Sequence, residues 1–320
     1  MTPKIKAHLA LLGTNLFFAI NYSAIKYLTA HEFAGPFGIN IVRIGASFIL
    51  FWTMFFFRPV KQKVKRKEWP LFILCALCAI ALNQMFFIKG LSYTFAIHAS
   101  LLTLITPILI MILAAITLKE RLTSFKIIGL IMGVSGAGLL ISFRENGLPG
   151  DHILLGDALV ILSSIAYTFY FILVKGLMEK YSPIMVTRMI FTFGFFMILP
   201  VCIPEFSAIS WSSFSGLEWV LLFIIVIPGT FLAYIFNVYG IKILDASTAG
   251  AYIYSQPIFA AIIAIISLGE SLNLYKILAG VLIFLGVYLS NKKRIKKPTI
   301  NNPNSDADAL SALSPKDTFQ

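Results

Sequence analysis

Long apolar runs alternate with short polar breaks along most of this chain. The runs are about 20 residues long, which is the length at which a helix crosses a hydrocarbon core of about 30 Å. The period-two alternation that marks a strand is absent from them. Because lipid offers the backbone no hydrogen-bonding partners, we predict membrane-spanning helices. The ten predicted spans cover roughly residues 7–28, 36–57, 69–90, 96–118, 124–143, 153–177, 183–203, 217–241, 246–268 and 273–290.

The composition and the placement of charge agree with this interpretation. Only 12% of the 320 residues are charged and 58% are hydrophobic, whereas a soluble domain usually carries about 25% charged residues. The net charge of +12 comes from Lys and Arg clusters such as those at 58–67 and 292–297. These clusters all fall on one side if the N-terminus is inside. We therefore predict a multi-pass protein of a bacterial inner membrane, with both termini cytoplasmic and no nucleic-acid partner.

The chain also repeats itself when it is shifted by 150 residues. The aligned pairs include Gly90 with Gly240, Ala96 with Ala246, Pro107 with Pro257, Glu120 with Glu270, Lys126 with Lys276, and Gly136 with Gly286. Each repeat holds five spans, an odd number, so the second repeat must insert upside down. Inverted repeats are a recurrent plan of secondary transporters. The predicted fold is thus an all-α polytopic membrane protein whose ten transmembrane helices form two inverted five-helix repeats.

This fold divides the chain into three parts. Residues 1–147 form the first repeat and residues 148–290 the second. Residues 291–320 begin with Asn-Lys-Lys-Arg and continue with Asn, Asp, Ser and Pro. That composition predicts a basic, disordered cytoplasmic tail.

Several motifs support a family resemblance. The stretch Asn21-Tyr22-Ser23-Ala24-Ile25-Lys26 resembles the first-helix motif of EamA-type transporters of the drug/metabolite transporter superfamily. Further matches are Arg43 on the second helix, the stretch from Gly90 through Pro107 to Leu122, Gly156-Asp157, and Gly269-Glu270-Ser271-Leu272. Phe18 and Ala19 depart from the pattern, because the family often has a Trp there. The resemblance implies a transporter of amino acids, their derivatives or other small metabolites.

Polar and aromatic side chains gather near the predicted mid-depth of several spans. Polar groups that face lipid are costly, so most should face a cavity or another helix. We predict that six of them line a solute cavity, with hydrogen bonding between helices as the alternative role. These six are Asn21, Gln84, Tyr167, Asn237, Tyr252 and Gln256. Amides and phenols favour a small polar or zwitterionic solute over a strong cation.

Charged residues and prolines within or beside the spans form a second group of candidates. The charged residues predicted to act in gating or in structure are Lys26, Arg43, Lys175, Arg188, Glu120 and Glu270. For the two acids we expect structural ion pairs with Lys126 and Lys276. Pro107 and Pro257 are mid-span candidates for hinges, with packing kinks as the alternative.

The sequence shows no catalytic motif, no metal-ligand cluster and no cofactor-binding motif. Cys75 and Cys78 lie in an apolar run without a neighbouring His or acid, so we interpret them as packing residues. We expect an exporter of a small polar metabolite that works by alternating access and is not an enzyme. The alternatives are a proton-coupled drug or cation efflux transporter, which the lack of a mid-span acid disfavours, and a membrane-embedded receptor or enzyme. The expected partners are a small-molecule solute and the lipid bilayer, with a homodimer left open.

Overall fold

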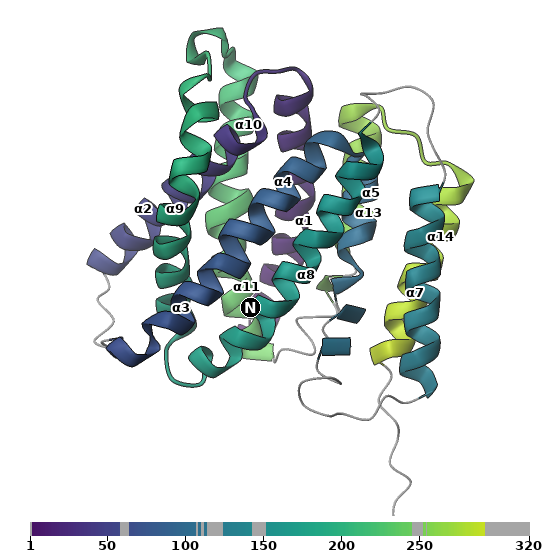
Figure 1. The fold of residues 1–320 in the computed structure, drawn as a ribbon, viewed down its shortest axis with the longest axis horizontal. Helices are drawn as coiled ribbons and strands as arrows, with labels where there is room; N and C mark the ends of the chain where they lie inside the picture. Colours follow the sequence, from purple (N-terminus) through teal and green to yellow (C-terminus); the bar gives the residue numbers. More distant parts are fainter. Residues whose placement is uncertain are drawn as a thin grey trace, which may run out of the picture.

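The computed structural model describes residues 2–57, 64–106, 108–109, 112–113, 124–142, 152–244, 252–253 and 255–291. The described residues form helices joined by short turns, and none of them belongs to a strand. Most helices run side by side in one bundle, and α7 and α14 stand together at its edge (Figure 1).

Within the described ranges, six helical segments are long and apolar enough to cross a membrane. They comprise α1 (Pro3–Ala30), α2 (Pro36–Phe57), α3 with α4 (Trp69–Ala76, Asn83–Tyr93), α8 (Ile153–Met178), α9 (Pro183–Ser207), and α10 with α11 (Gly216–Val226, Ala233–Leu244). Shorter helices are α5 (Ala96–Thr103), α7 (Ser124–Ser142), α13 (Ser255–Leu268) and α14 (Leu274–Asn291). The latter fall within the predicted fourth, fifth, ninth and tenth spans. The polytopic helical class is confirmed, and the count of ten spans stays a prediction.

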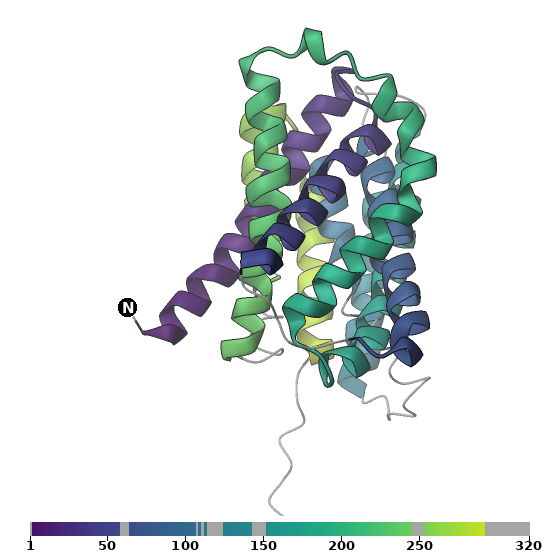
Figure 2. The ribbon, with the colours of Figure 1, turned by 90° about the vertical axis from the view of Figure 1, so that its left-hand side faces the viewer.

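Helix starts follow from local sequence signals. Thr2 and Ser182 each precede a proline and cap α1 and α9 with their hydroxyl oxygens. Ser215 and Glu218 form a reciprocal capping box at the start of α10. The helix α1 then continues for 28 residues, or about 42 Å at 1.5 Å per residue. Its first turns project from the bundle (Figure 2).

In the described part of the chain, two membrane-spanning segments contain a π-helical stretch at matching places. Leu77–Leu82 joins α3 to α4, and Ile227–Leu232 joins α10 to α11. The segments begin 150 residues apart, which is the shift that aligns the two halves of the sequence. A π-helical turn leaves backbone carbonyl groups out of the regular hydrogen-bond pattern, and such turns are frequent at functional sites. The 150-residue shift therefore relates the local backbone geometry of the two halves as well as their residue types.

The helices of each half pack mainly against helices of the other half. Helix α1 packs against α11 and α13. Its counterpart by the 150-residue shift, α8, packs against α4, the counterpart of α11, and against α5, which lies in the predicted span equivalent to that of α13. Counterparts also pack directly on one another, as α2 does on α9 and α7 on α14 (Figure 1). Every one of these contacts joins the first half of the chain to the second.

The packing of α7 on α14 is close enough to exclude side chains. A Cβ atom at Gly136 would lie 2.8 Å from the Ala279 carbonyl oxygen, and one at Gly286 would lie 2.6 Å from the Gly129 carbonyl oxygen. The earlier residue of α7 thus meets the later residue of α14, so the two helices run antiparallel. The two contacts are each other's equivalents under the 150-residue shift, as a twofold relation requires.

Candidate functional site

Arg43 lies at the centre of a buried polar network. Its side chain is 4% exposed, and its Nη2 donates a hydrogen bond to Gln84 Oε1 at 2.8 Å. Gln84 Nε2 in turn donates to the Asn83 Oδ1 at 3.2 Å and to the Tyr234 hydroxyl at 3.4 Å. The network therefore joins α2 and α4 of the first half to α11 of the second.

Aromatic and amide side chains extend this network to three further helices. The Tyr22 hydroxyl on α1 interacts with Arg43 and with the side chains of Thr103 and Gln256. Tyr167 on α8 lies close enough to Tyr234 for their hydroxyl groups to interact electrostatically. We define the central cluster as Tyr22, Arg43, Gln84, Tyr167, Tyr234 and Gln256.

Three of the six predicted cavity residues, Gln84, Tyr167 and Gln256, belong to the central cluster. Asn21 precedes Tyr22 on α1, is buried, and donates from Nδ2 to the Gly229 carbonyl oxygen in the π-helical segment at 3.2 Å. Asn237 is half-buried on α11, three residues beyond Tyr234.

Tyr252 lies in another part of the bundle. Its hydroxyl contacts His8 Nδ1 at 2.6 Å. His8 precedes Tyr22 on α1 by 14 residues, or about 21 Å along the helix axis. The structure thus separates Tyr252 from Tyr22 and from the Gln256 side chain that contacts Tyr22. Tyr22 and Tyr234, which the sequence analysis did not select, take part in the cluster. The 150-residue shift could have identified Tyr234, because it aligns Tyr234 with Gln84.

The charged residues at the ends of the helices have structural partners. Lys26 Nζ donates to the Ser92 carbonyl oxygen at 3.0 Å and interacts electrostatically with Glu270. The Glu270 carboxylate accepts hydrogen bonds from the backbone N–H groups of Ala96 at 2.7 Å and Ile97 at 3.1 Å. The sequence analysis named Lys276 as its expected partner and did not identify these amides. A carboxylate that caps a helix start explains the contact between α5 and the 269–273 segment without a transport role.

Arg188 has surroundings unlike those of Arg43. Its guanidinium carbon lies 3.6 Å from the centroid of the Phe55 ring and 4.8 Å from that of Trp52. Its Nη2 contacts Met185 Sδ at 2.7 Å. These stacking contacts between α2 and α9 support the structural interpretation of Arg188.

Of the four remaining predicted residues, only Pro257 lies wholly within the described part of the structure. Pro257 is buried in the first turn of α13, where a proline removes no needed hydrogen bond, and Ile253 just before it forms a turn. The irregular backbone thus precedes Pro257 and does not interrupt the helix at it. Glu120, Pro107 and the side chain of Lys175 lie outside the described residues.

His98, in the first turn of α5, is buried beside an acid of α8. It is 1% exposed, and its Nδ1 lies 3.3 Å from Asp157 Oδ2. The Thr94 hydroxyl donates a hydrogen bond to the other oxygen of the same carboxylate. These side chains join the start of α5 to α8 inside the protein.

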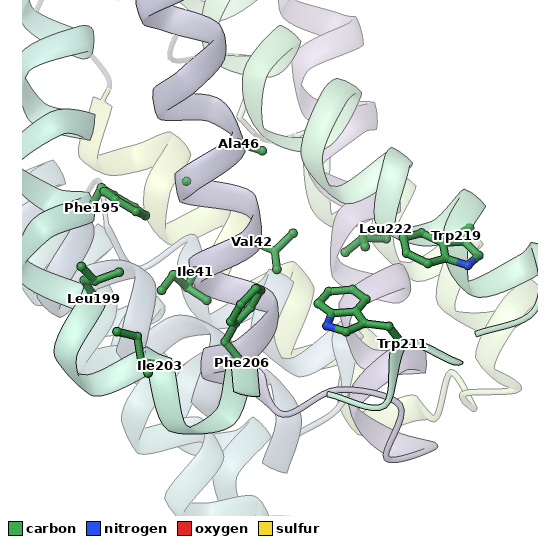
Figure 3. A pocket seen from close by; sticks show the side chains of 11 residues that line it. Ile41, Val42, Ala46, Phe195, Leu199, Ile203, Phe206, Trp211, Trp219 and Leu222 are labelled. Carbon is green, nitrogen blue, oxygen red and sulfur yellow. The ribbon is translucent and has the colours of Figure 1, made fainter. Parts of the chain in front are cut away.

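An apolar groove of about 550 Å³ lies elsewhere, between α2, α9 and α10 (Figure 3). Ile41, Val42 and Ala46 of α2 lie between Phe195 and Leu199 on one side and Trp219 on the other. Two indole nitrogens are the only polar side-chain atoms of its lining, and none of the six predicted cavity residues belongs to it. Such a lining suits hydrocarbon and offers little to orient a polar solute.

Comparisons with known proteins decide the family. The sequence profile of the EamA-like transporter family matches residues 5–142 and again residues 154–292. The chain belongs to the EamA-like transporter family. The profile thus matches twice, once on each side of the segment that separates the two predicted repeats.

Similar proteins cover nearly the whole chain. An uncharacterized transporter of Archaeoglobus fulgidus is 27% identical over 91% of this chain and 100% of its own length. The uncharacterized transporter YyaM of Bacillus subtilis is 23% identical over 95% of this chain and 99% of its own. A solved crystal structure of another protein matches with a TM-score of 0.56 at 17% identity, over 87% of this chain and 96% of that one, which supports the fold alone.

The EamA-like chain is therefore a multi-pass membrane protein of a transporter family, with a lipid environment and a small-molecule solute as its implied partners. Cys75, Cys78 and Cys202 are free and buried, as expected for packing residues. Within the described ranges, no three His, Cys, Asp or Glu side chains are grouped so that they could hold a metal ion.

Proposed function

We propose that this protein is a secondary transporter that exports a small polar metabolite, such as an amino acid or a derivative, by alternating access. The solute binds at the central cluster. One observation carries this proposal: the hydrogen bond between Gln84 and Tyr234, which are equivalent residues of the two halves. Two atoms that a twofold axis exchanges lie on opposite sides of it at equal distances. Equivalent side chains that touch must therefore lie beside the axis.

The position beside the axis matters because of how inverted repeats work. Substrate sites in such transporters lie near mid-membrane at the interface between the repeats. The central cluster draws on α1, α2 and α4 of one half and on α8, α11 and α13 of the other. It also lies beside the π-helical segment 227–232, to whose Gly229 carbonyl oxygen Asn21 donates. Polar groups of both halves thus meet where the solute would bind.

The antiparallel packing of α7 on α14, the matched π-helical segments and the double profile match support the two-repeat plan. Repeats 1–147 and 148–290, related by inversion, can each adopt the conformation of the other. Inward-open and outward-open states are then near mirror images. The Lys and Arg distribution supports a cytoplasmic location for both termini, as part of this proposal.

The alternative, proton-coupled efflux of a cationic drug, finds less support at this site. A cation in the central cluster would meet the Arg43 guanidinium. Among the described acids, Glu205, Glu218 and Glu270 accept hydrogen bonds from backbone N–H groups at helix starts. Asp157 binds Thr94 and His98, Glu68 binds Lys180, and the two others, Glu32 and Glu179, lie in turns. We therefore favour a solute that is neutral, zwitterionic or anionic.

Flux into liposomes that contain the pure protein tests this function. Counterflow of labelled amino acids and derivatives should occur with the wild-type protein. The Gln84→Ala variant loses hydrogen bonds to Arg43 and Tyr234 and should slow flux about ten- to hundredfold. Ser267→Ala is the matched control, because that exposed hydroxyl donates only to Ile263 on its own helix. Absence of counterflow across the panel, or equal flux in Gln84→Ala, would contradict the proposal.

A further inference from the structure

The Arg43 guanidinium is buried without a counter-charge. It is 4% exposed, and within the described residues no carboxylate lies within ion-pair distance of it. Its neighbours are the amide of Gln84 and the phenols of Tyr22 and Tyr234. A buried charge without a partner is costly in a low-dielectric interior. Arg43 therefore has the surroundings of an anion-binding residue.

The hydrogen-bonding capacity of Arg43 is also only partly used. Its Nε is buried and has no acceptor among the described residues. Arginine presents five N–H donors in a planar fork that matches the two oxygens of a carboxylate. The bond from Nη2 to Gln84 fixes the plane of this fork and leaves the Nε donor open.

The two phenols that neighbour Arg43 each pack against a phenylalanine ring. The rings of Tyr22 and Phe87 lie 4.7 Å apart between centroids, and those of Phe191 and Tyr234 lie 5.0 Å apart. These ring pairs offer apolar contact surface beside the phenol groups, which add polar edges. An acid group that pairs with Arg43 could therefore carry an apolar or aromatic substituent.

We propose that Arg43 binds the carboxylate of the transported solute, and that the solute is a monocarboxylate with an apolar or aromatic group. This inference rests on the proposed function, since it assigns a solute class to the same cluster. Arg43, treated above as a gating or structural residue, then becomes a binding residue. Arg188, its counterpart on α9, differs because aromatic rings cover its guanidinium.

Matched acids and amides test the assignment and do not require the natural solute to be identified. The probes are N-acetylphenylalanine against N-acetylphenylalaninamide, and benzoate against benzamide, with sodium chloride as the inorganic anion. Ligands that bind the folded state raise its Tm. The acids should raise the Tm of the wild-type protein in detergent at lower concentrations than the amides or chloride do.

Substitution of Arg43 should remove that preference. In Arg43→Gln the apparent affinity for the acids should fall about ten- to hundredfold, as for loss of a charged hydrogen-bonded pair, while the amides change little. Arg43→Lys should recover part of the acid preference, since it retains the charge without the planar fork. Lys180→Gln removes the same charge from an exposed side chain paired with Glu68 and should behave as the wild type.

Three results would overturn the assignment: acids that stabilise the wild-type protein no better than their amides, chloride that equals the acids, or an acid preference that persists in Arg43→Gln. Arg43→Lys provides the comparison if Arg43→Gln does not fold. In that case an acid-over-amide preference in Arg43→Lys as large as that of the wild type counts against it. Acid binding without counterflow would contradict transport alone. Counterflow of neutral solutes that is insensitive to Arg43 would contradict the carboxylate site alone.

Discussion

The carboxylate of Glu270 accepts a hydrogen bond from the backbone N–H of Ala96 at 2.7 Å. The two residues lie in different halves of the chain, and the contact caps the N-terminus of α5. A second N–H, from Ile97, binds the other carboxylate oxygen. The first N–H groups of a helix have no partner within the helix, so a carboxylate there satisfies donors and complements the helix dipole.

Replacement of Glu270 by Ala should destabilise the protein by about 1–3 kcal/mol, because it leaves buried N–H donors without acceptors. The measurement is the Tm of the purified protein in detergent, together with counterflow in the fraction that folds. We expect a lower Tm and near-normal flux per folded molecule. Glu179→Ala, at an exposed turn residue, is the control. A normal Tm with abolished flux would indicate a transport role for Glu270 instead.

The packing of α7 on α14 gives a second prediction. An Ala at position 286 would place Cβ 2.6 Å from the Gly129 carbonyl oxygen and 2.6 Å from the Gly133 nitrogen. Gly286→Ala should therefore separate the helices and lower both Tm and the yield of monodisperse protein. The same change at Gly138 meets open space and should be neutral or stabilise the helix by up to about 1 kcal/mol. Equal stability of the two variants would contradict the observed close packing.

The sequence predicted much of this fold because lipid imposes simple rules. Helix starts at Pro36, Ala96, Ser124, Ile153 and Pro183 agree with the predicted spans. Gly129 and Gly133 lie four residues apart in the fifth predicted span, and the structure places Gly286 against both of them. Length and hydropathy determine where a helix can cross a membrane, and small residues determine where two backbones can meet.

The candidate site was harder to predict, because hydropathy indicates how deep a residue lies in the membrane but not which way its side chain points. Asn21 and Tyr22 are adjacent in sequence, yet one points to Gly229 and the other toward Arg43. Tyr252 has the residue type of a cavity residue but contacts His8. The rotation of each helix about its own axis determines which polar side chains lie close to one another. The π-helical segments change that rotation, and no residue pattern in Leu77–Leu82 predicts a π-helical segment there.

The orientation in the membrane provides a third prediction. Lys67 lies in the 3₁₀ turn before α3, and Ser210 lies between α9 and α10. The distribution of Lys and Arg predicts that Lys67 faces the cytoplasm and Ser210 the opposite side. Reporter fusions after each residue, one active only inside and one only outside the cell, measure this. Equal reporter activity at both sites would be incompatible with the predicted order of spans.

A matched pair of Tyr→Phe substitutions distinguishes the central cluster from the wider set of predicted cavity residues. Tyr234→Phe removes the hydroxyl that accepts from Gln84, at the contact between equivalent residues of the two halves. Loss of a neutral hydrogen bond is worth about 0.5–1.5 kcal/mol, so counterflow should slow by about two- to tenfold.

Tyr252→Phe makes the same chemical change at a hydroxyl that binds His8. If the solute binds where the halves meet, this variant should exchange solute at nearly the wild-type rate, because its hydroxyl lies about 21 Å along α1 from Tyr22. Both variants retain their rings, so both should insert and remain monodisperse. A greater loss of flux in Tyr252→Phe than in Tyr234→Phe would move the solute site toward the His8 end of α1. It would also remove the central contact between the halves from the transport mechanism.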